Sequence, residues 1–352
     1  MDVVAAFQRQ AIVCEDLGSP MYAELIRLIV DDYEVGGVAA AVLAGYEDRP
    51  FGDAIALRLL GSVHRLVLAG EAPELAAFYP SVGGSWDPVL GWEAFEQVLQ
   101  SRSAELRSLL TQPPQTNEVG RAAALYGGLL QLVETVPLPV RLFEIGASGG
   151  LNLRADHFRY NVADGTSFGV VDSPVVFDNA WSGQSLKPVP LRIAERVGSD
   201  IAPVNPLTDE GARTLTSYVW PDMPERLARL RGALSVAREV PADVRREDAV
   251  SFVRGLELSP GHVTVVWHSI MWQYLTREDR AAVDARLAEL GARAVASSPL
   301  ARLRLEPLPR TAGASYEFLV ELQLWPGGVR RVLGRAEPHG QGLVWELPSE
   351  IR

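Results

Sequence analysis

The stretch EIGASGGLNL, residues 144–153, combines an acidic residue with a glycine-rich turn, and both features can serve ligand binding. It follows the apolar run VRLF, whose composition and length are typical of a buried strand. Glycines in the turn permit positive φ angles and let a ligand approach the backbone closely. A helix that begins after the turn would direct its N-terminus at that ligand. The alternative interpretation is a tight turn within the core.

The spacing of this turn resembles motif I of S-adenosylmethionine-dependent methyltransferases, in which an acidic residue precedes Gly-x-Gly-x-Gly. Glu144, Gly146 and Gly150 match that motif, whereas Ser148 stands at its middle glycine. The resemblance implies that Glu144 helps to hold the methionine amino end of the cofactor. The Ser148 hydroxyl either bonds to the cofactor or fills part of the space that the cofactor needs. Asn152, just beyond the turn, is a further candidate cofactor contact.

Two aspartates near the ends of later strands are candidate contacts for the nucleoside part of the same cofactor. In RVGSDIAPVNP, Asp200 lies where such methyltransferases have a carboxylate for the ribose hydroxyls, and a carboxylate can accept two hydroxyl bonds. The alternative for Asp200 is an Asx turn before a helix. In VRREDAVSFV, Asp248 is assigned to the adenine end. Its alternative role is the N-cap of the helix AVSFVRGL.

His268, Glu118 and Arg121 are the candidate catalytic residues. His268 lies at the end of the strand HVTVVWHS, and an imidazole can accept a proton near neutral pH. Its alternative role is that of a hydrogen-bonded structural histidine. In TNEVGR, Glu118 and Arg121 share a helix face, so both can line a cleft. Alternatively, Thr116 or Asn117 caps the helix, with Glu118 in its first turn.

The apolar pattern divides the chain into two halves that would position these residues. Residues 1–112 show helical spacing, as in MYAELIRLIVDDY, and predict a helical cap or substrate domain. The double proline of TQPPQTNE marks the boundary. Over residues 113–352 strands alternate with helices, which predicts a parallel sheet with right-handed crossovers. A β-rich insertion near residues 158–190 makes the first crossover unusually long.

The second half is predicted to contain strands at VRLFEIG, at HVTVVWHS and at RAVASS, residues 293–298. Its last part, YEFLVELQLWPGGVRRVLG followed by GLVWEL, predicts a strand, a turn, a second strand, a loop and a third strand. An antiparallel hairpin that closes a parallel sheet resembles the end of methyltransferase-type Rossmann folds. We therefore expect an α/β, Rossmann-like methyltransferase-type sheet with a C-terminal antiparallel hairpin, preceded by an N-terminal α-helical domain.

Several uncommon stretches occur in the order found in a bacterial family known only as a domain of unknown function, DUF2332. They are QTNEVGRAAAL, EIGASGGLNL, VWPDMPERLARLRGAL, VVWHSIMWQYL and HGQGLVWEL. The resemblance covers about residues 5–347, and it implies a relation to S-adenosylmethionine-dependent methyltransferases. It supports the fold more than the activity.

Composition argues against several classes of function. A net charge of −11 disfavours nonspecific binding to nucleic acids and to anionic membranes. The single cysteine, Cys14, rules out an internal disulfide, and the five histidines lack the spacing of metal ligands, so we expect no metal. The N-terminal segment MDVVAAFQRQ is unlike a signal peptide, and no apolar stretch approaches the ~20 residues that span a bilayer. We therefore expect a cytoplasmic protein.

The first functional hypothesis is an S-adenosylmethionine-dependent methyltransferase-like enzyme that acts on a small molecule or a carrier-bound metabolite, with the N-terminal helices as a lid. The second keeps the fold but performs an intramolecular substitution or ring closure in a biosynthetic pathway. Ser148 and the insertion favour it, because both fall where the cofactor would lie. The third is a non-catalytic partner subunit. A protein partner or a homo-oligomer is compatible with all three.

Overall fold

The computed structural model describes residues 2–48, 53–311 and 313–350. The chain forms two compact units, of which the first comprises residues 1–116 and 208–228 and the second comprises the remainder. The boundary predicted between residues 112 and 113 divides the chain once. The first unit, in contrast, takes in an additional segment from later in the chain.

The first unit consists of helices that bury their apolar faces in a common core. In α4, Leu59, Val63 and Leu66 recur at helical spacing and are fully buried. Burial of one such side chain contributes about 1.5–3 kcal/mol. The stretch EAFEQVLQSRSAELRSLL, residues 93–110, has the amphipathic pattern of one helix, but Arg102 leaves the helical conformation (φ −116°, ψ 18°) and separates two helices. The helices of this unit are α1 (Val3–Asp16), α2 (Pro20–Glu34), α3 (Val38–Leu43), α4 (Ile55–Leu68), α5 (Pro73–Ala76), η2 (Pro80–Val82), α6 (Pro88–Ser101), α7 (Ser103–Leu109) and α9 (Asp209–Ser217).

The second unit holds a nine-stranded mixed sheet with the strand order β5-β12-β11-β10-β9-β8-β1-β6-β7. From β9 to β7, each strand runs parallel to its neighbour. β10, β11 and β12 continue from β9 as an antiparallel meander, and β5 pairs in parallel with β12. The predicted α/β class with a mostly parallel sheet is thus confirmed. The strands of this sheet are β1 (Val140–Ile145), β5 (Ser182–Gly183), β6 (Ile193–Asp200), β7 (Asp243–Arg246), β8 (Val263–Ser269), β9 (Leu300–Pro309), β10 (Tyr316–Trp325), β11 (Val329–Arg335) and β12 (Val344–Glu350).

The strand predicted at residues 293–298 is wrong. Helix α12 (Arg277–Arg293) continues to Arg293, and Val295 and Ser298 form only an isolated bridge. The strand, β9, begins at Leu300, immediately after Pro299. Its leucines alternate with charged residues that the fold buries, so no continuous apolar run marks it in the sequence.

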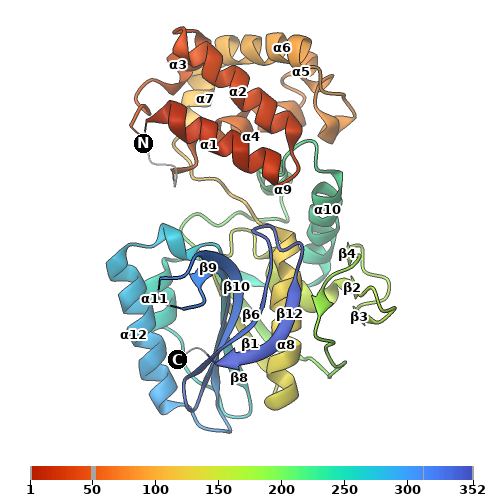
Figure 1. Ribbon diagram of the computed structural model, residues 1–352, viewed down its shortest axis with the longest axis vertical. Helices are drawn as coiled ribbons and strands as arrows, with labels where there is room; N and C mark the ends of the chain where they lie inside the picture. Colours follow the sequence, from red (N-terminus) through yellow and green to blue (C-terminus); the bar gives the residue numbers. More distant parts are fainter. Residues whose placement is uncertain (1, 49–52, 312, 351–352) are drawn as a thin grey trace. The chain divides into compact units, whose positions relative to one another are not determined.

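Helices cover both faces of this sheet, with α11 and α12 on one face and α8 on the other (Figure 1). The alternation of β9 side chains agrees with this arrangement. Leu300 packs in the core beside α12, whereas a Cβ atom on Gly128 of α8 would lie 2.7 Å from Leu303. Gly128 therefore lets α8 approach the sheet closely. The helices of this unit are η3 (Val119–Arg121), α8 (Ala122–Thr135), η4 (Leu151–His157), α11 (Ala249–Arg254), η5 (Trp272–Tyr274) and α12 (Arg277–Arg293), together with α10 (Pro224–Glu239), which starts in the segment 208–228.

The turn after β1 leads into the 3₁₀ helix η4, where the sequence suggested an α-helix. Arg154 has non-helical dihedral angles there, and its guanidinium donates to the carbonyl oxygens of Gly150 (2.7 Å) and Val240 (2.7 Å). The segment 158–190 contains β5 and a small separate sheet of order β3-β2-β4. The strands of that sheet are β2 (Arg159–Asn161), β3 (Ser167–Gly169) and β4 (Val176–Phe177).

Candidate functional site

Strand β1 lies where the strand order reverses, with β6 and β7 on one side and β8 and β9 on the other. Because these strands are parallel, their C-terminal ends share one edge of the sheet. Ligands of open parallel sheets bind at this edge, beside such a reversal. The turn of residues 144–150, Asp200 at the end of β6 and His268 near the end of β8 all lie at this edge.

The turn keeps the backbone of a glycine turn although one glycine is replaced. Gly146, Ser148 and Gly150 all have positive φ angles, of 71°, 51° and 67°. A residue with a Cβ atom costs about 1–2 kcal/mol in this region, so the conformation of Ser148 needs support. The Ser148 N–H donates to Asp200 Oδ2 at 2.9 Å, and the N–H groups of Gly146 and Ala147 both donate to the Ser199 carbonyl oxygen at 2.9 Å.

Asp200 is a structural member of this turn. Its Oδ2 accepts from Ser148, its Oδ1 accepts from the Ala202 N–H at 2.9 Å, and its carbonyl oxygen accepts from the Glu247 N–H at 3.0 Å. It stands at the end of β6, the strand next to β1, as the sequence suggested. Each carboxylate oxygen has a second lone pair, so the group can also accept hydroxyl hydrogen bonds from a ligand.

Glu144 is a buried carboxyl group at the same edge, 3% exposed. Its Oε2 has no hydrogen-bond partner within the described part of the chain. Burial raises the pKa of Glu144 to about 8, and the charges of Arg121 and Arg154 and the indole of Trp267 oppose this only in part. A carboxyl group that carries a proton near neutral pH can exchange that proton for a cationic ligand group.

The side chains of His268 and Glu144 point to opposite faces of the sheet. Side chains alternate along a strand, and Val266 packs in the core beside α12, so His268, two residues further on, faces that side. Ile145 also packs in that core, so Glu144 faces the side of α8. The structure therefore does not bring His268 together with the carboxyl group of the turn.

Both ring nitrogens of His268 are occupied. Nδ1 lies 2.7 Å from Glu306 Oε1, and Nε2 accepts from Arg302 Nε–H at 3.1 Å. Because arginine can only donate, Nε2 is unprotonated and Nδ1 carries the proton. Burial lowers the pKa of His268 to about 4; the hydrogen bond to Glu306 opposes this shift, and the Arg302 charge adds to it. This geometry favours the alternative role of His268, that of a hydrogen-bonded structural histidine.

The segment TNEVGR lies directly against the glycine turn. Asn117 Oδ1 accepts from the Leu151 N–H at 3.0 Å, and the Glu118 carbonyl oxygen accepts from Asn152 Nδ2 at 3.1 Å. Glu118 itself caps η3, because its Oε1 accepts from the Gly120 N–H at 2.9 Å. The alternative in which Thr116 or Asn117 caps this helix is therefore wrong, because the N-cap is Glu118 itself.

His339 is a member of this cluster to which the sequence gave no role. Its Nδ1 lies 3.1 Å from Glu118 Oε2, and both side chains are largely buried. Arg121 holds the same loop, because its Nε donates to the Pro338 carbonyl oxygen at 3.0 Å and its Nη1 donates to that of Ser269 at 3.2 Å. A lone histidine 221 positions from Glu118 carries no local signal, so only the fold reveals the pair.

Asp248 lies past the end of β7, the strand next to β6, and is exposed. Its carboxylate accepts from the Ser251 N–H at 2.9 Å and from the Ser251 hydroxyl at 2.7 Å. Asp248 is thus the N-cap of α11, the alternative that the sequence offered.

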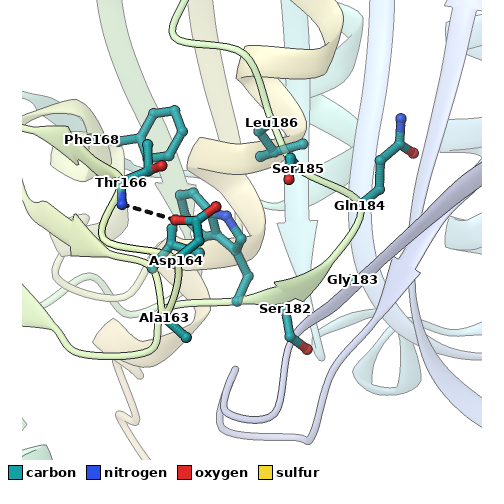
Figure 2. A pocket seen from close by; sticks show the side chains of 11 residues that line it. Ala163, Asp164, Thr166, Phe168, Ser182, Gly183, Gln184, Ser185 and Leu186 are labelled. Atoms are coloured by element: carbon teal, nitrogen blue, oxygen red, sulfur yellow. Dashed lines mark hydrogen bonds between the residues drawn. The ribbon is translucent and has the colours of Figure 1, made fainter.

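Two cavities of the second unit contain none of the residues assigned to the site. The cavity in Figure 2 has a volume of about 270 Å³ and lies between residues 162–168 and 181–186. Its aromatic members, Phe168 and Trp181, are only 7% and 3% exposed, so they offer little surface for stacking. A groove of about 380 Å³ lies between α8 and the strands β10 and β11.

Within residues 2–48, 53–311 and 313–350, no group of three or more His, Cys, Asp or Glu side chains is arranged to hold a metal ion. In the same part of the chain, none of the helices combines the length and the apolar character needed to cross a bilayer.

Comparison with known proteins gives a match to a family model. A family model described as "Uncharacterized protein conserved in bacteria (DUF2332)" matches residues 4–345, a range that includes every residue of the turn and of the cluster around Glu118. The search among curated proteins found no match.

Proposed function

The chain belongs to the DUF2332 family, whose model matches residues 4–345, and we propose that it is an S-adenosylmethionine-dependent methyltransferase-like enzyme with a Rossmann-like fold. The proposed substrate is a small molecule or a carrier-bound metabolite. The observation that carries the proposal is the hydrogen bond from the Ser148 N–H to Asp200 Oδ2, at 2.9 Å. It joins a glycine-type turn to a carboxylate at the reversal of strand order, where nucleotide ligands bind in α/β sheets.

The order of the parallel strands supports the proposed fold. Counted along the chain, the five consecutive parallel strands lie in the order third, second, first, fourth and fifth, as β7, β6, β1, β8 and β9. This is the order of doubly wound nucleotide-binding sheets. The antiparallel meander that follows β9 takes the position of the sixth strand.

The polar groups at the turn fit those of S-adenosylmethionine. The Glu144 carboxyl group suits an ammonium group, since its Oε2 is buried without a hydrogen-bond partner within the described residues. Asp200 suits the ribose hydroxyls, and Asn152 Oδ1, which is buried and has no hydrogen-bond partner among the described residues, offers a further acceptor. The bound cofactor supplies a methyl group on a good leaving group. The protein then chiefly aligns the acceptor, and positioning of this kind contributes up to about 7–11 kcal/mol.

Glu118 is the candidate general base of this proposal. Its Oε2 lies 3.1 Å from His339 Nδ1, and Asn152 links Glu118 to the turn. His268 is not assigned this role, because both of its nitrogens already have partners. Arg121 positions the loop that carries His339.

Calorimetric titration with S-adenosylmethionine and S-adenosylhomocysteine tests the proposal. We expect micromolar binding by the wild-type protein and none by Asp200→Ala or Gly146→Val. The first change removes the acceptor of Ser148, and the second puts a branched side chain at φ 71°, where its Cβ would lie 3.1 Å from Met271. Asp164→Ala, which removes an exposed carboxylate from another turn, serves as the control. A folded wild-type protein that binds neither ligand at millimolar concentration would contradict the proposal.

Ser148→Gly tests how the replaced glycine acts. Glycine adopts φ 51° without strain, so we expect little change in stability and a roughly threefold to tenfold weaker affinity for S-adenosylhomocysteine, because a hydrogen bond of about 0.5–1.5 kcal/mol is lost. Calorimetry and urea unfolding measure the two quantities. Tighter binding would mean that the serine side chain occupies cofactor space.

A second function, intramolecular substitution or ring closure on the same fold, is favoured by one observation. The Met271 side chain covers Gly146, the first glycine of the turn. It therefore reduces the space beside Gly146 in which a dissociable cofactor would lie. The titration above separates the two functions, because only the first requires that S-adenosylmethionine binds.

A further inference from the structure

The turn that follows β8 carries Met271 to the glycine turn that follows β1. A Cβ atom on Gly146 would lie 3.1 Å from Met271 Cβ, 3.2 Å from its Cγ and 3.5 Å from its Cε. The methionine side chain therefore occupies the space that the missing side chain of Gly146 leaves open. A ligand that contacts the backbone at Gly146 has to displace it, and an unbranched thioether can rotate to allow this.

The backbone of this turn is strained and needs support from outside it. Ile270, immediately before Met271, has a φ angle of 48°, which is unusual for a β-branched residue. Such conformations persist when the surrounding structure holds them. Here the Ile270 N–H donates to the Leu305 carbonyl oxygen of β9 at 3.0 Å.

Glu306, the next residue of β9, supplies most of the remaining support. Its Oε1 accepts from the backbone N–H groups of Met271 (3.2 Å) and Trp272 (3.3 Å) and from His268 Nδ1 (2.7 Å). The residue is 1% exposed, so water does not compete for these donors. The buried Glu306 Oε1 thus fixes the backbone at Met271 and Trp272, and with it the position of the Met271 side chain.

Arg302 and His268 hold the other side of the turn. The Trp272 ring stacks on the His268 ring at 4.9 Å, and the Arg302 guanidinium lies 4.4 Å from the centre of the same indole. Arg302 also donates to His268 Nε2, which leaves Nδ1 protonated and directed at Glu306. The neutral His268 ring therefore hydrogen-bonds to both the Arg302 guanidinium and the Glu306 carboxylate.

From these contacts we propose that Met271 determines which ligands reach the glycine turn, and that Glu306 is the positioning residue that keeps it there. The inference rests on the proposed function. In that function Glu144 takes the ammonium group and Asp200 takes the ribose, so the sulfur-containing arm between them passes Gly146. Met271 then weakens the binding of ligands that carry this arm, and it does not change the affinity for the nucleoside alone.

Calorimetry with S-adenosylhomocysteine and adenosine, which lacks the arm, tests the role of Met271. We expect Met271→Ala to bind S-adenosylhomocysteine at least tenfold more tightly than the wild type, with the adenosine affinity changed less than twofold. Leu275→Ala, which shortens another apolar side chain close to the same turn, should change neither. An unchanged or weaker S-adenosylhomocysteine affinity in Met271→Ala overturns the inference while the proposed function stands. If neither protein binds either ligand, the proposed function and the inference both fail.

The role of Glu306 is tested by two substitutions and by their combination with the first. Glu306→Gln keeps an oxygen acceptor for the turn and should bind as the wild type does. Glu306→Leu should tighten S-adenosylhomocysteine binding as Met271→Ala does, and the double variant should gain nothing further, because Glu306 acts through Met271. Additive effects, or weaker binding by Glu306→Gln, would show that Glu306 acts by another route. Should Glu306→Leu fail to fold, the Gln variant decides.

Discussion

Glu144→Gln will make the protein more stable at pH 8, by roughly 3–4 kcal/mol. Burial raises the pKa of Glu144 from its ordinary value of 4.5 to about 8, so the folded state keeps a proton that the unfolded state releases between these two values. The stability of the wild-type protein therefore falls as the pH rises from 4.5 to 8, by about 1.4 kcal/mol for each unit of the pKa difference. Glutamine is neutral throughout and avoids this loss.

Urea unfolding at pH 5 and pH 8, followed by circular dichroism, measures the effect. The gain should be small at pH 5 and large at pH 8, and Glu239→Gln on the exposed side of α10 should show neither. Equal gains at the two pH values would mean that the proton on Glu144 is not their cause. If the proposed function is correct, the same substitution also weakens S-adenosylhomocysteine binding at pH 8. The buried carboxyl group would then reduce stability in exchange for ligand recognition.

Acidification from pH 7 to pH 4.5 will destabilise the protein through two buried histidines, by roughly 2–3 kcal/mol for each. Burial lowers the pKa of both His64 and His268 from 6.5 to about 4. Between these pH values each histidine is protonated in the unfolded state and stays neutral in the folded state. The free energy of unfolding therefore keeps this contribution in full above pH 6.5 and loses it as the pH falls towards 4. His64 is held by the Ser217 carbonyl oxygen at 3.1 Å and the Ser81 hydroxyl at 2.8 Å.

Replacement of each histidine by glutamine separates its contribution. His268→Gln and His64→Gln should lose stability at pH 7, because they disturb buried hydrogen bonds. The further loss between pH 7 and pH 4.5 should nevertheless be smaller than in the wild type. His262→Gln, in a partly exposed loop, should leave that further loss unchanged. An undiminished acid effect in both buried variants would assign the acid sensitivity to other groups.

The strands that carry the turn could be predicted because their signals are local. The run before Glu144 is short and mostly apolar, and a glycine turn follows it, so both the strand and the turn are predictable from the sequence. β9 was missed because Arg302, Arg304 and Glu306 interrupt its leucines. Their burial depends on partners from other elements, such as Glu321 of β10, whose Oε1 lies 2.8 Å from Arg304 Nη2. Pairing of this kind is invisible in a local pattern.

The candidate site likewise contains residues that a local pattern reveals and residues whose role depends on distant segments. The sequence located Asp200 and the segment around Glu118, because a strand end and a helix start each have recognisable residues. It assigned His268 as a base because residue type alone cannot reveal that Glu306, 38 positions later, and Arg302 occupy the ring nitrogens. Contacts between distant segments decide the chemical state of a histidine, and these appear only with the fold.

The two edges of the nine-stranded sheet have a consequence for the behaviour of the protein at high concentration. One edge is β5, which has only two residues, and the other is β7, whose sequence DVRR is rich in exposed charge. Short and charged edge strands are poor templates for a strand of another molecule. Strand addition is therefore disfavoured at the β7 edge, whereas at the other edge β5 pairs with Val344 and Trp345 alone among the described residues of β12, so association of copies at high concentration would start beside the rest of β12.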